Sequence, residues 1–484
     1  MTSSPTGPLH TLSLLDTVAA FRSREVSPVE FLDAHIERIE RLDPRTNAIS
    51  EKLYDTARDS AREAERAYAQ AADPSALPPL LGVPLLVKAQ QEMAGYENSR
   101  GSLTREGIMG TKDNPSVARL KSAGAVPFAR TTNPEFSCAT FTQTRMWGVT
   151  RNPWNLDRTP GGSSGGSGAA VAAGYSPLAT ATDIAGSTRI PAAFCGLVGF
   201  KTPFGRVPGA GVTVGDWYRG EHVLTRTVAD AAYGTNVLAG QDYFDSMSLK
   251  SEPPLPTSWA GAAGMSGQRI AYSRDLGCYE VDADVEANFL HVVDALRAAG
   301  AEVVEVEVGL DAQEIDEVSG AHYGHILAPS MVDMAGGPDR VKDMEDYAQL
   351  FHAHTTGKAR RFPLYDTLQM ENHVQQQLAH AMDGFDVLLT PTSAVGSLEA
   401  DNAYLDGIER PSGHLDFYWQ AHMTIPFNIA NRNPVLAVPS GLGDTGVPTS
   451  VQVVGHPYQD RSVFAVGAAI EELLPFAPSP FMAD

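Results

Sequence analysis

The chain has 484 residues, of which 43% are hydrophobic and 19% are charged, the proportions of an ordinary folded globular protein. Its 58 acidic and 36 basic residues give a net charge of −22, which argues against binding to nucleic acid or to an anionic membrane. No run of about 18 uninterrupted apolar residues is present, so the sequence predicts no membrane-spanning helix.

The cysteines are too few and too scattered for a disulfide framework. The three of them, Cys138, Cys195 and Cys278, form no spaced cluster. This usage predicts a reducing, cytoplasmic location. Residues 1–20 contain no Lys or Arg ahead of their short apolar run, so we also expect no secretory signal.

Residues 1–75 are expected to form a helical N-terminal arm. Residues 27–30 (Ser-Pro-Val-Glu) have the form of a capping box with proline at the first helical position. Apolar residues recur at helical spacing over residues 32–42, and Pro44 is expected to end this helix. A second, charged helix is predicted over residues 56–70.

Beyond the arm, the pattern changes to an alternation of strands and helices. Residues 80–88 are apolar up to Lys88 and predict a buried strand that enters a site. The further predicted helices cover residues 117–123, 285–296 and 462–474, and the predicted strands cover residues 125–129, 269–273, 304–308, 434–439 and 450–454. Such alternation is typical of an α/β fold, here one domain over residues 1–484. Residues 310–420 have the least regular pattern and are expected to surround the substrate site.

Two neighbouring segments have the most unusual composition. Residues 161–170 are Gly-Gly-Ser-Ser-Gly-Gly-Ser-Gly-Ala-Ala, and residues 182–191 are Thr-Asp-Ile-Ala-Gly-Ser-Thr-Arg-Ile-Pro. Glycines permit backbone conformations closed to other residues and let main-chain N–H groups approach a ligand. Serines within such a run are held on close-packed backbone, as a nucleophile requires. The two segments are therefore the candidate active site.

Two kinds of glycine-rich site fit this run poorly. A nucleotide-binding loop requires Gly-Lys-Ser/Thr after the glycines or a strand directly before them, and residues 152–160 are a loop. A nucleophile elbow, with residues 162–166 as Gly-x-Ser-x-Gly, also needs a strand upstream and a histidine base. His422 and His456 are candidates for that base, but no feature of the sequence selects either.

A third kind of site is indicated by a family resemblance. Residues 147–201 closely resemble the amidase signature family through Gly-Gly-Ser-Ser-Gly-Gly-Ser-Gly, Asp-Ile-Ala-Gly-Ser, Arg-Ile-Pro and Phe-Cys-Gly in this order. Residues 82–88 are similar to the lysine strand of the family. Residues 424–428 and 446–455 are similar to its C-terminal elements. The resemblance extends from about residue 12 to residue 474 and is weakest between residues 240 and 420. It implies a single α/β/α domain with a twisted mixed β-sheet flanked by helices.

Carried over residue by residue, the resemblance implies a catalytic relay. Ser187 would be the nucleophile, Ser163 a bridging serine after a cis peptide bond from Gly162, and Lys88 the base. A serine hydroxyl is a poor nucleophile until a base removes its proton. A lysine is such a base only when it is neutral, which the apolar residues 85–87 favour by keeping water away.

The resemblance also implies an oxyanion hole and a set of supporting residues. The oxyanion donors would be successive backbone N–H groups, those of Ile184, Ala185, Gly186 and Ser187. Such a donor typically contributes about 2.7–4 kcal/mol to the stability of the transition state. The supporting residues would be Gly162, Ser164, Asp183 and Arg189. We expect no metal and no other cofactor, because His352 and His354 have no third ligand at metal-ligand spacing.

The expected activity is that of a stand-alone amidohydrolase acting on small carboxamides, of the aryl acylamidase or urethanase kind, with esterase side activity. Its substrates would be small amides, esters or carbamates, and the enzyme would be a monomer or homodimer that binds neither nucleic acid nor membranes. The alternative is the A-type subunit of a tRNA-dependent amidotransferase, which works with partner proteins. Ala89 and Gln90 follow the lysine where many relatives have an aspartate, so substrate preference is not transferred from the family.

Overall fold

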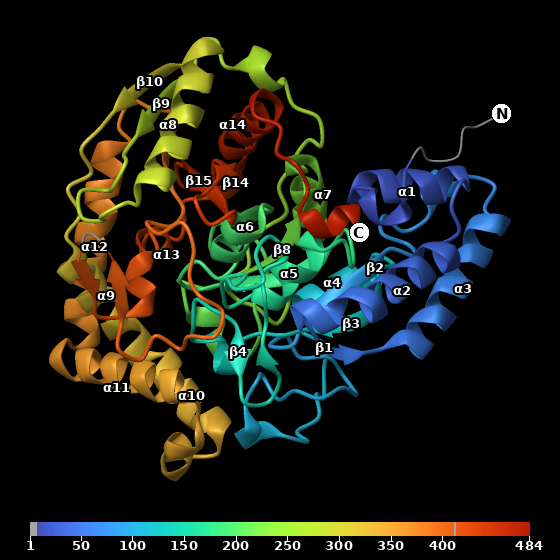
Figure 1. The fold of residues 1–484 in the computed structure, drawn as a ribbon, viewed down its shortest axis with the longest axis horizontal. Helices are drawn as coiled ribbons and strands as arrows, with labels where there is room; N and C mark the ends of the chain where they lie inside the picture. The colour runs from blue at the N-terminus through green and yellow to red at the C-terminus, as the bar shows by residue number, and fades with distance from the viewer. Residues whose placement is uncertain (1–6, 411–412) are drawn as a thin grey trace.

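One large mixed β-sheet runs through the computed structural model, which describes residues 7–410 and 413–484 (Figure 1). Its 11 strands lie in the order β1-β3-β2-β6-β8-β7-β14-β15-β11-β9-β10. Their bounds are Ile49–Lys52 (β1), Pro84–Lys88 (β2), Val126–Thr131 (β3), Ala179–Asp183 (β6), Val198–Lys201 (β7), Gly220–Thr225 (β8), Arg269–Tyr272 (β9), Glu302–Glu305 (β10), Val387–Pro391 (β11), Val435–Leu442 (β14) and Pro448–Gly455 (β15). Two short ribbons pair Gln143–Thr144 (β4) with Gly148–Val149 (β5), and Ile408–Arg410 (β12) with Gly413–Leu415 (β13).

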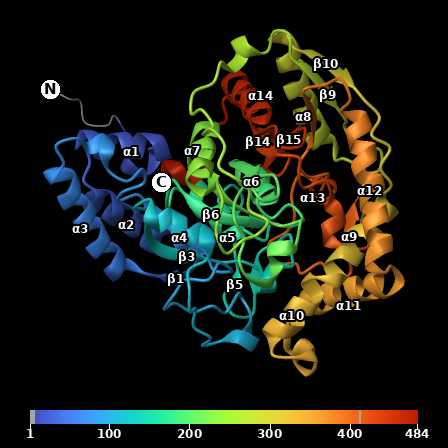
Figure 2. The same cartoon turned by 180° about the vertical axis from the view of Figure 1, so that it is seen from behind.

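Helices flank this sheet, as Figures 1 and 2 show from opposite sides. They are Leu14–Ser23 (α1), Pro28–Thr46 (α2), Tyr54–Gln70 (α3), Pro115–Ser122 (α4), Gly165–Ala172 (α5), Arg189–Cys195 (α6), Val228–Leu238 (α7), Ala283–Ala298 (α8), Ala312–His325 (α9), Leu327–Ala335 (α10), Asp346–Arg361 (α11), Leu364–Ala381 (α12), Pro426–Ile429 (α13) and Asp460–Leu473 (α14). Within the described residues, none of the helices combines the length and the apolar character needed to cross a bilayer.

Both faces of the sheet are covered because successive side chains of a strand point to opposite sides. On β14, Leu436 and Val438 belong to the apolar cluster that includes α8 and α14. Val435 and Ala437, which alternate with them, belong to the clusters that include residues of α6 on the other face. The predicted α/β fold with a mixed sheet flanked by helices is thereby confirmed.

Two neighbouring parallel strands bring the candidate site together. Strands β2 and β6 are parallel, with Leu86 opposite Ala179. Lys88 is the last residue of β2 and Asp183 is the last residue of β6. Since parallel strands have their carboxyl ends at the same edge of a sheet, the two glycine-rich segments and the lysine meet there.

The N-terminal arm differs from the prediction in two ways. It is not wholly helical, because β1 pairs antiparallel with β3 and forms an edge of the large sheet. Pro44 lies inside α2, not at its end, although Ser27 does cap the start of that helix. The helix continues past the proline because the N–H of Asn47 bonds to the carbonyl of Asp43 at 2.7 Å and closes a last turn.

The expectation of irregular structure over residues 310–420 is wrong for its larger part, where helices α9 to α12 follow one another. Helix α9 packs on α11 at very short range, since a Cβ added at Gly324 would lie 2.0 Å from the carbonyl oxygen of Thr355. Buried small and polar residues interrupt the apolar face of α9, whereas α10 and α12 carry apolar residues at helical spacing, so a helical pattern was present in part of this region. The strand predicted over residues 304–308 lies earlier in the chain, because β10 covers Glu302–Glu305.

Candidate active site

Lys88 is a buried ionisable residue of the candidate site. Its side chain is fully buried at the end of β2, and its backbone N–H bonds to Thr180. Its Nζ atom lies 2.7 Å from the Oγ of Ser163, 3.0 Å from the Oγ of Ser164 and 2.9 Å from the Oγ1 of Thr182. The amine is therefore surrounded by three hydroxyl groups, and it has no carboxylate partner within hydrogen-bond distance among the described residues.

This environment makes Lys88 an unusually weak base for a lysine. The pKa of Lys88 is lowered from its usual 10.5 to about 7, mainly by burial; the carboxylates of Glu221 and Asp183 act in the opposite direction, and Arg219 adds to the lowering. Removal of an ammonium group from water disfavours its charged form, which is the main cause here. A large fraction of Lys88 is therefore neutral near pH 7 and can accept a proton.

The glycine-rich segment brings its serines close to the lysine by tight backbone packing. The peptide bond between Gly162 and Ser163 is cis. A Cβ at Gly162 would lie 2.6 Å from the carbonyl oxygen of Phe141, so only glycine fits this position. The N–H of Ser164 bonds to the carbonyl of Ser187 at 3.2 Å and joins the two segments.

Ser187 lines a cavity. The residue is 5% exposed and lines that cavity, and its Oγ has no hydrogen-bond partner within residues 7–410 and 413–484. The preceding Gly186 has a φ of +117°, in the region that favours glycine, and a Cβ there would lie 2.2 Å from the Oγ1 of Thr424. The structure thus places Lys88 beside Ser163 but forms no hydrogen bond between Ser163 and Ser187.

The loop before Ser187 presents several backbone donors. The N–H of Gly186 is occupied, because it donates to a carboxylate oxygen of Asp183 at 2.7 Å. The N–H groups of Ile184, Ala185 and Ser187 have no hydrogen-bond partner in the described part of the chain. Of the four expected oxyanion donors, Gly186 is therefore already engaged and the other three are open to a ligand.

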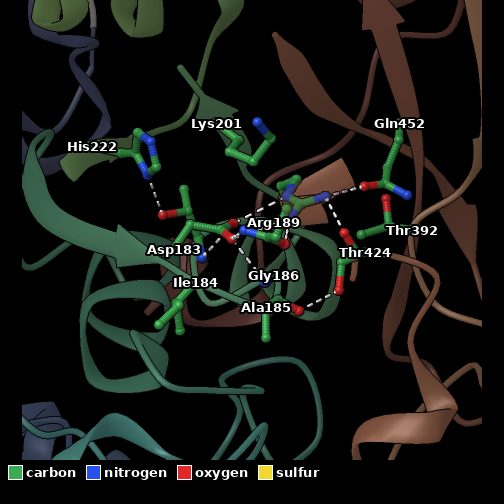
Figure 3. A network of polar contacts seen from close by, with 12 residues as sticks. Asp183, Ile184, Ala185, Gly186, Arg189, Lys201, His222, Thr392, Thr424 and Gln452 are labelled. Carbon is green, nitrogen blue, oxygen red and sulfur yellow. Dashed lines mark hydrogen bonds and ion pairs between the residues drawn. The ribbon is translucent and has the colours of Figure 1, made fainter. Parts of the chain in front are cut away.

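A buried ion pair supports this loop (Figure 3). Asp183 and Arg189 are both almost fully buried and form a two-point contact, with Nε and Nη2 of the arginine each 3.0 Å from a carboxylate oxygen. Arg189 also donates to the carbonyl of Thr424 at 3.0 Å and to Gln452 at 2.7 Å. Burial alone would raise the pKa of Asp183, but the neighbouring guanidinium of Arg189 outweighs burial and lowers the pKa well below its usual range.

Two residues that sequence reasoning missed fix the orientation of the same loop. The hydroxyl of Tyr323 donates to the carbonyl of Ile184 at 3.0 Å, and the hydroxyl of Thr424 donates to the carbonyl of Ala185 at 2.5 Å. Thr424 begins one of the segments that resemble the family, so a signal for it existed. Tyr323 lies in the region whose pattern was uninformative, and nothing in the sequence pointed to it.

The cavity beside Ser187 is mainly apolar and aromatic. Its aromatic lining consists of Tyr323, Phe351, Tyr418 and Trp419. Ile184 and Ala185 of the loop also line it, and so does His354, which bonds to Asp316 at 3.0 Å. Among the described lining residues there is no Asp, Glu, Lys or Arg. A charged ligand group would therefore lose its hydration in this cavity without gaining a partner of opposite charge.

The histidines considered for a nucleophile elbow lie elsewhere. His422 contacts the Oγ of Ser393 at 3.0 Å, and His456 contacts the carbonyl of Phe385 at 2.7 Å. Neither has a hydrogen bond to Ser163 or to another serine of the glycine-rich segment among the described residues. A serine–histidine pair at this segment is therefore not formed.

Known proteins similar to this chain include amidotransferase subunits and amidases. The family model described as Amidase matches residues 30–464. The chain is 33% identical to the A-type subunit of the glutamyl-tRNA(Gln) amidotransferase of Acidothermus cellulolyticus, over 94% of this chain and 93% of that one. It is 31% identical to an acylamidase of Rhodococcus erythropolis, over 97% of each chain.

The fold agrees with these sequence similarities. The solved structure of a bacterial aryl acylamidase, one of the amidase signature enzymes, matches with a TM-score of 0.88 and 27% identity, over 97% of this chain and 98% of that chain. The family match extends over most of the chain and includes both glycine-rich segments and the lysine strand. This chain therefore belongs to the amidase signature family and is an amide-hydrolysing enzyme.

Proposed function

We propose that the enzyme hydrolyses small, neutral carboxamides with an apolar or aromatic group, through an acyl-enzyme on Ser187. The observation that carries this proposal is that Ser187 is hydrogen-bonded through its backbone carbonyl to Ser164, a neighbour of Lys88, and also lines a cavity. Lys88 has a pKa of about 7, which suits a base, and its amine lies 2.7 Å from Ser163. The cavity is aromatic, without charged side chains among its described lining residues.

In the proposed reaction, neutral Lys88 takes the proton of Ser163, which in turn takes the proton of Ser187. The Ser187 oxygen attacks the amide carbon, and the amine leaves with a proton returned through Ser163. Water then hydrolyses the acyl-enzyme by the same relay. Contacts between catalytic groups are often long before substrate binds and shorten in the complex, and we expect this of Ser163 and Ser187.

The open N–H groups of Ile184, Ala185 and Ser187 are the donors proposed for the oxyanion. They would receive the negative charge that develops on the carbonyl oxygen, and each such donor typically contributes about 2.7–4 kcal/mol. Gly186 would act indirectly, because its N–H bond to Asp183 fixes the curvature of the loop.

The proposed substrates are anilides, aryl carbamates and aryl esters. Aromatic side chains bind flat apolar groups by dispersion and by burial of apolar surface. The walls of Tyr418 and Trp419 provide such a surface close to Ser187. A carboxylate or ammonium on the same part of the substrate would be desolvated without compensation.

The second candidate is an amidotransferase A-type subunit, favoured by the 33% identity to the Acidothermus cellulolyticus protein. That role requires partner proteins and a charged amino-acid amide such as glutamine as the nitrogen source. The uncharged cavity lining favours the stand-alone amidase. The expected monomer or homodimer and the expected cytoplasmic location stay predictions.

The test compares initial hydrolysis rates of the wild type and Ser187→Ala on four matched substrates: an alkyl amide, an anilide, an aryl carbamate and an aryl ester. We expect the anilide and the two other aryl substrates to react faster than the alkyl amide, and the variant to lose nearly all turnover. Glutamine hydrolysis is measured in parallel, and gel filtration gives the oligomeric state. Glutamine turnover above that of every aryl substrate would support the amidotransferase role instead.

A further inference from the structure

Thr182 forms a bridge between Lys88 and Gln90. Its Oγ1 lies 2.9 Å from the Nζ of Lys88, and its hydroxyl donates to the side-chain carbonyl oxygen of Gln90 at 2.9 Å. A threonine hydroxyl has one proton only. Because that proton is directed to Gln90, Thr182 can only accept a hydrogen bond from Lys88.

The hydroxyl proton of Ser164 also has an acceptor other than Lys88. Its Oγ accepts from the backbone N–H of Thr182 at 3.3 Å, and its hydroxyl donates to the carbonyl of Thr182 at 3.4 Å. The 3.0 Å contact between Ser164 and Lys88 is therefore a bond that the lysine donates. Lys88 thus has two neighbours that accept from it: Gln90 holds the Thr182 proton at 2.9 Å, and the carbonyl of Thr182 holds the Ser164 proton more weakly at 3.4 Å.

The hydrogen count of the amine then determines its third contact. A neutral amine has two N–H bonds and one lone pair, whereas the ammonium form has three N–H bonds and no lone pair. In neutral Lys88 the two N–H groups are used by Ser164 and Thr182. The lone pair is left for Ser163, whose hydroxyl has no other hydrogen-bond partner among the described residues.

We propose that Gln90 is a positioning residue, whose amide oxygen holds the Thr182 proton and thereby directs the lone pair of Lys88 at Ser163. This inference rests on the proposed role of Lys88 as the base. Without an acceptor at position 90, the Thr182 hydroxyl is free to donate to Lys88 and to compete with Ser163 for the lone pair. Gln90 follows Lys88 by two residues, past the end of β2, and is partly buried.

The test uses two substitutions of similar size. Gln90→Met removes the acceptor, and Gln90→Glu keeps an oxygen that can only accept. For Gln90→Met we expect kcat to fall roughly tenfold, the rate equivalent of one neutral hydrogen bond, with KM unchanged. For Gln90→Glu we expect kcat to recover at high pH, with the acid limb of the pH profile displaced upward by the added negative charge. The exposed Gln70, at the end of α3, provides the matched control Gln70→Met.

A second measurement does not depend on the choice of amide. The rate at which a fluorophosphonate labels Ser187 reports how well the serine is activated. We expect Gln90→Met to be labelled about tenfold more slowly than the wild type and Gln90→Glu to be labelled at the wild-type rate at high pH. If the wild type is labelled and Gln90→Met reacts equally fast, the inference is wrong while the relay stands. If Ser187 of the wild type is not labelled at all, the proposed relay itself fails, and the inference fails with it.

Discussion

The hydroxyl of Tyr323 on α9 donates a 3.0 Å hydrogen bond to the carbonyl oxygen of Ile184. That carbonyl belongs to the same planar peptide unit as the N–H of Ala185, one of the proposed oxyanion donors. A helix that also lines the cavity beside Ser187 therefore fixes the direction of this proposed donor. This bond therefore links the cavity wall to the proposed oxyanion hole.

Tyr323→Phe removes this bond and leaves the ring in the cavity wall. We expect kcat to fall roughly tenfold, because the Ala185 N–H is then free to turn, and we expect KM to change little. Steady-state kinetics on an anilide measure both constants. Tyr233→Phe is the matched control, since the hydroxyl of Tyr233 bonds to Pro79 far from the site. Equal losses in the two variants would contradict a specific role of Tyr323.

The pH dependence of activity follows from the burial of Lys88. Its pKa of about 7 means that the neutral, basic form grows as the pH rises, so kcat/KM is expected to increase through a midpoint near pH 7 and then level off. Lys88→Met removes the base and is expected to abolish this rise together with most of the activity. A pH profile that is flat between pH 5.5 and 8.5, which are about 1.5 units either side of that pKa, would contradict the assignment.

The buried ion pair of Asp183 and Arg189 is expected to affect the free energy of unfolding. Arg189→Met leaves a buried carboxylate without its cation, and such a loss typically costs about 3–5 kcal/mol in the free energy of unfolding. The double variant Asp183→Asn, Arg189→Met removes both charges and is expected to unfold at a higher denaturant concentration than Arg189→Met alone. Urea unfolding followed by fluorescence measures both. If the double variant is the less stable of the two, burial of an unpaired charge is not the cause.

Substrate charge provides a test of the cavity. Adding a carboxylate to the aromatic ring of a good anilide substrate is expected to lower kcat/KM by about a hundredfold or more, because the charge loses water and meets no cationic side chain. An uncharged carboxamide of similar size at the same ring position is the control, and it separates charge from bulk. Equal rates for the charged and uncharged anilides would show that the ring binds outside the cavity beside Ser187.

The sequence predicted those parts of the site that lie in short, unusual segments. Lys88, Ser163 and Ser187 stand in such segments, and the expected cis bond after Gly162 and the closeness of Lys88 to Ser163 are confirmed. Their catalytic roles stay predictions. The contact of Tyr323 with Ile184 joins residues 139 positions apart, and no local pattern encodes a bond of that kind.

In the fold, too, some elements were predicted from the sequence and others were not. Strand β2 was predicted because its residues are apolar up to Lys88, and all five are buried. The helices α9 to α12 were not predicted, although α10 and α12 carry apolar residues at helical spacing. In α9, buried small and polar residues such as Gly320 and His322 interrupt that pattern. Strand β1 was missed because a four-residue segment with two charges, Glu51 and Lys52, has no strand pattern of its own and exists through its pairing with β3.

Strand β1 bears on self-association of the chain, because it lies at an edge of the large sheet. It covers one outer margin of the large sheet, where β3 would otherwise present its free backbone groups. An uncovered, apolar strand at a sheet margin is a template for pairing with another chain, and a short strand bearing charges is a poor one. We therefore expect the N-terminal segment to reduce pairing of the sheet edge with other chains, in addition to forming part of the fold. A chain that begins after Lys52 would keep every residue of the candidate site, but it would expose the edge of β3 and the apolar surface that α2 covers, and it is expected to aggregate.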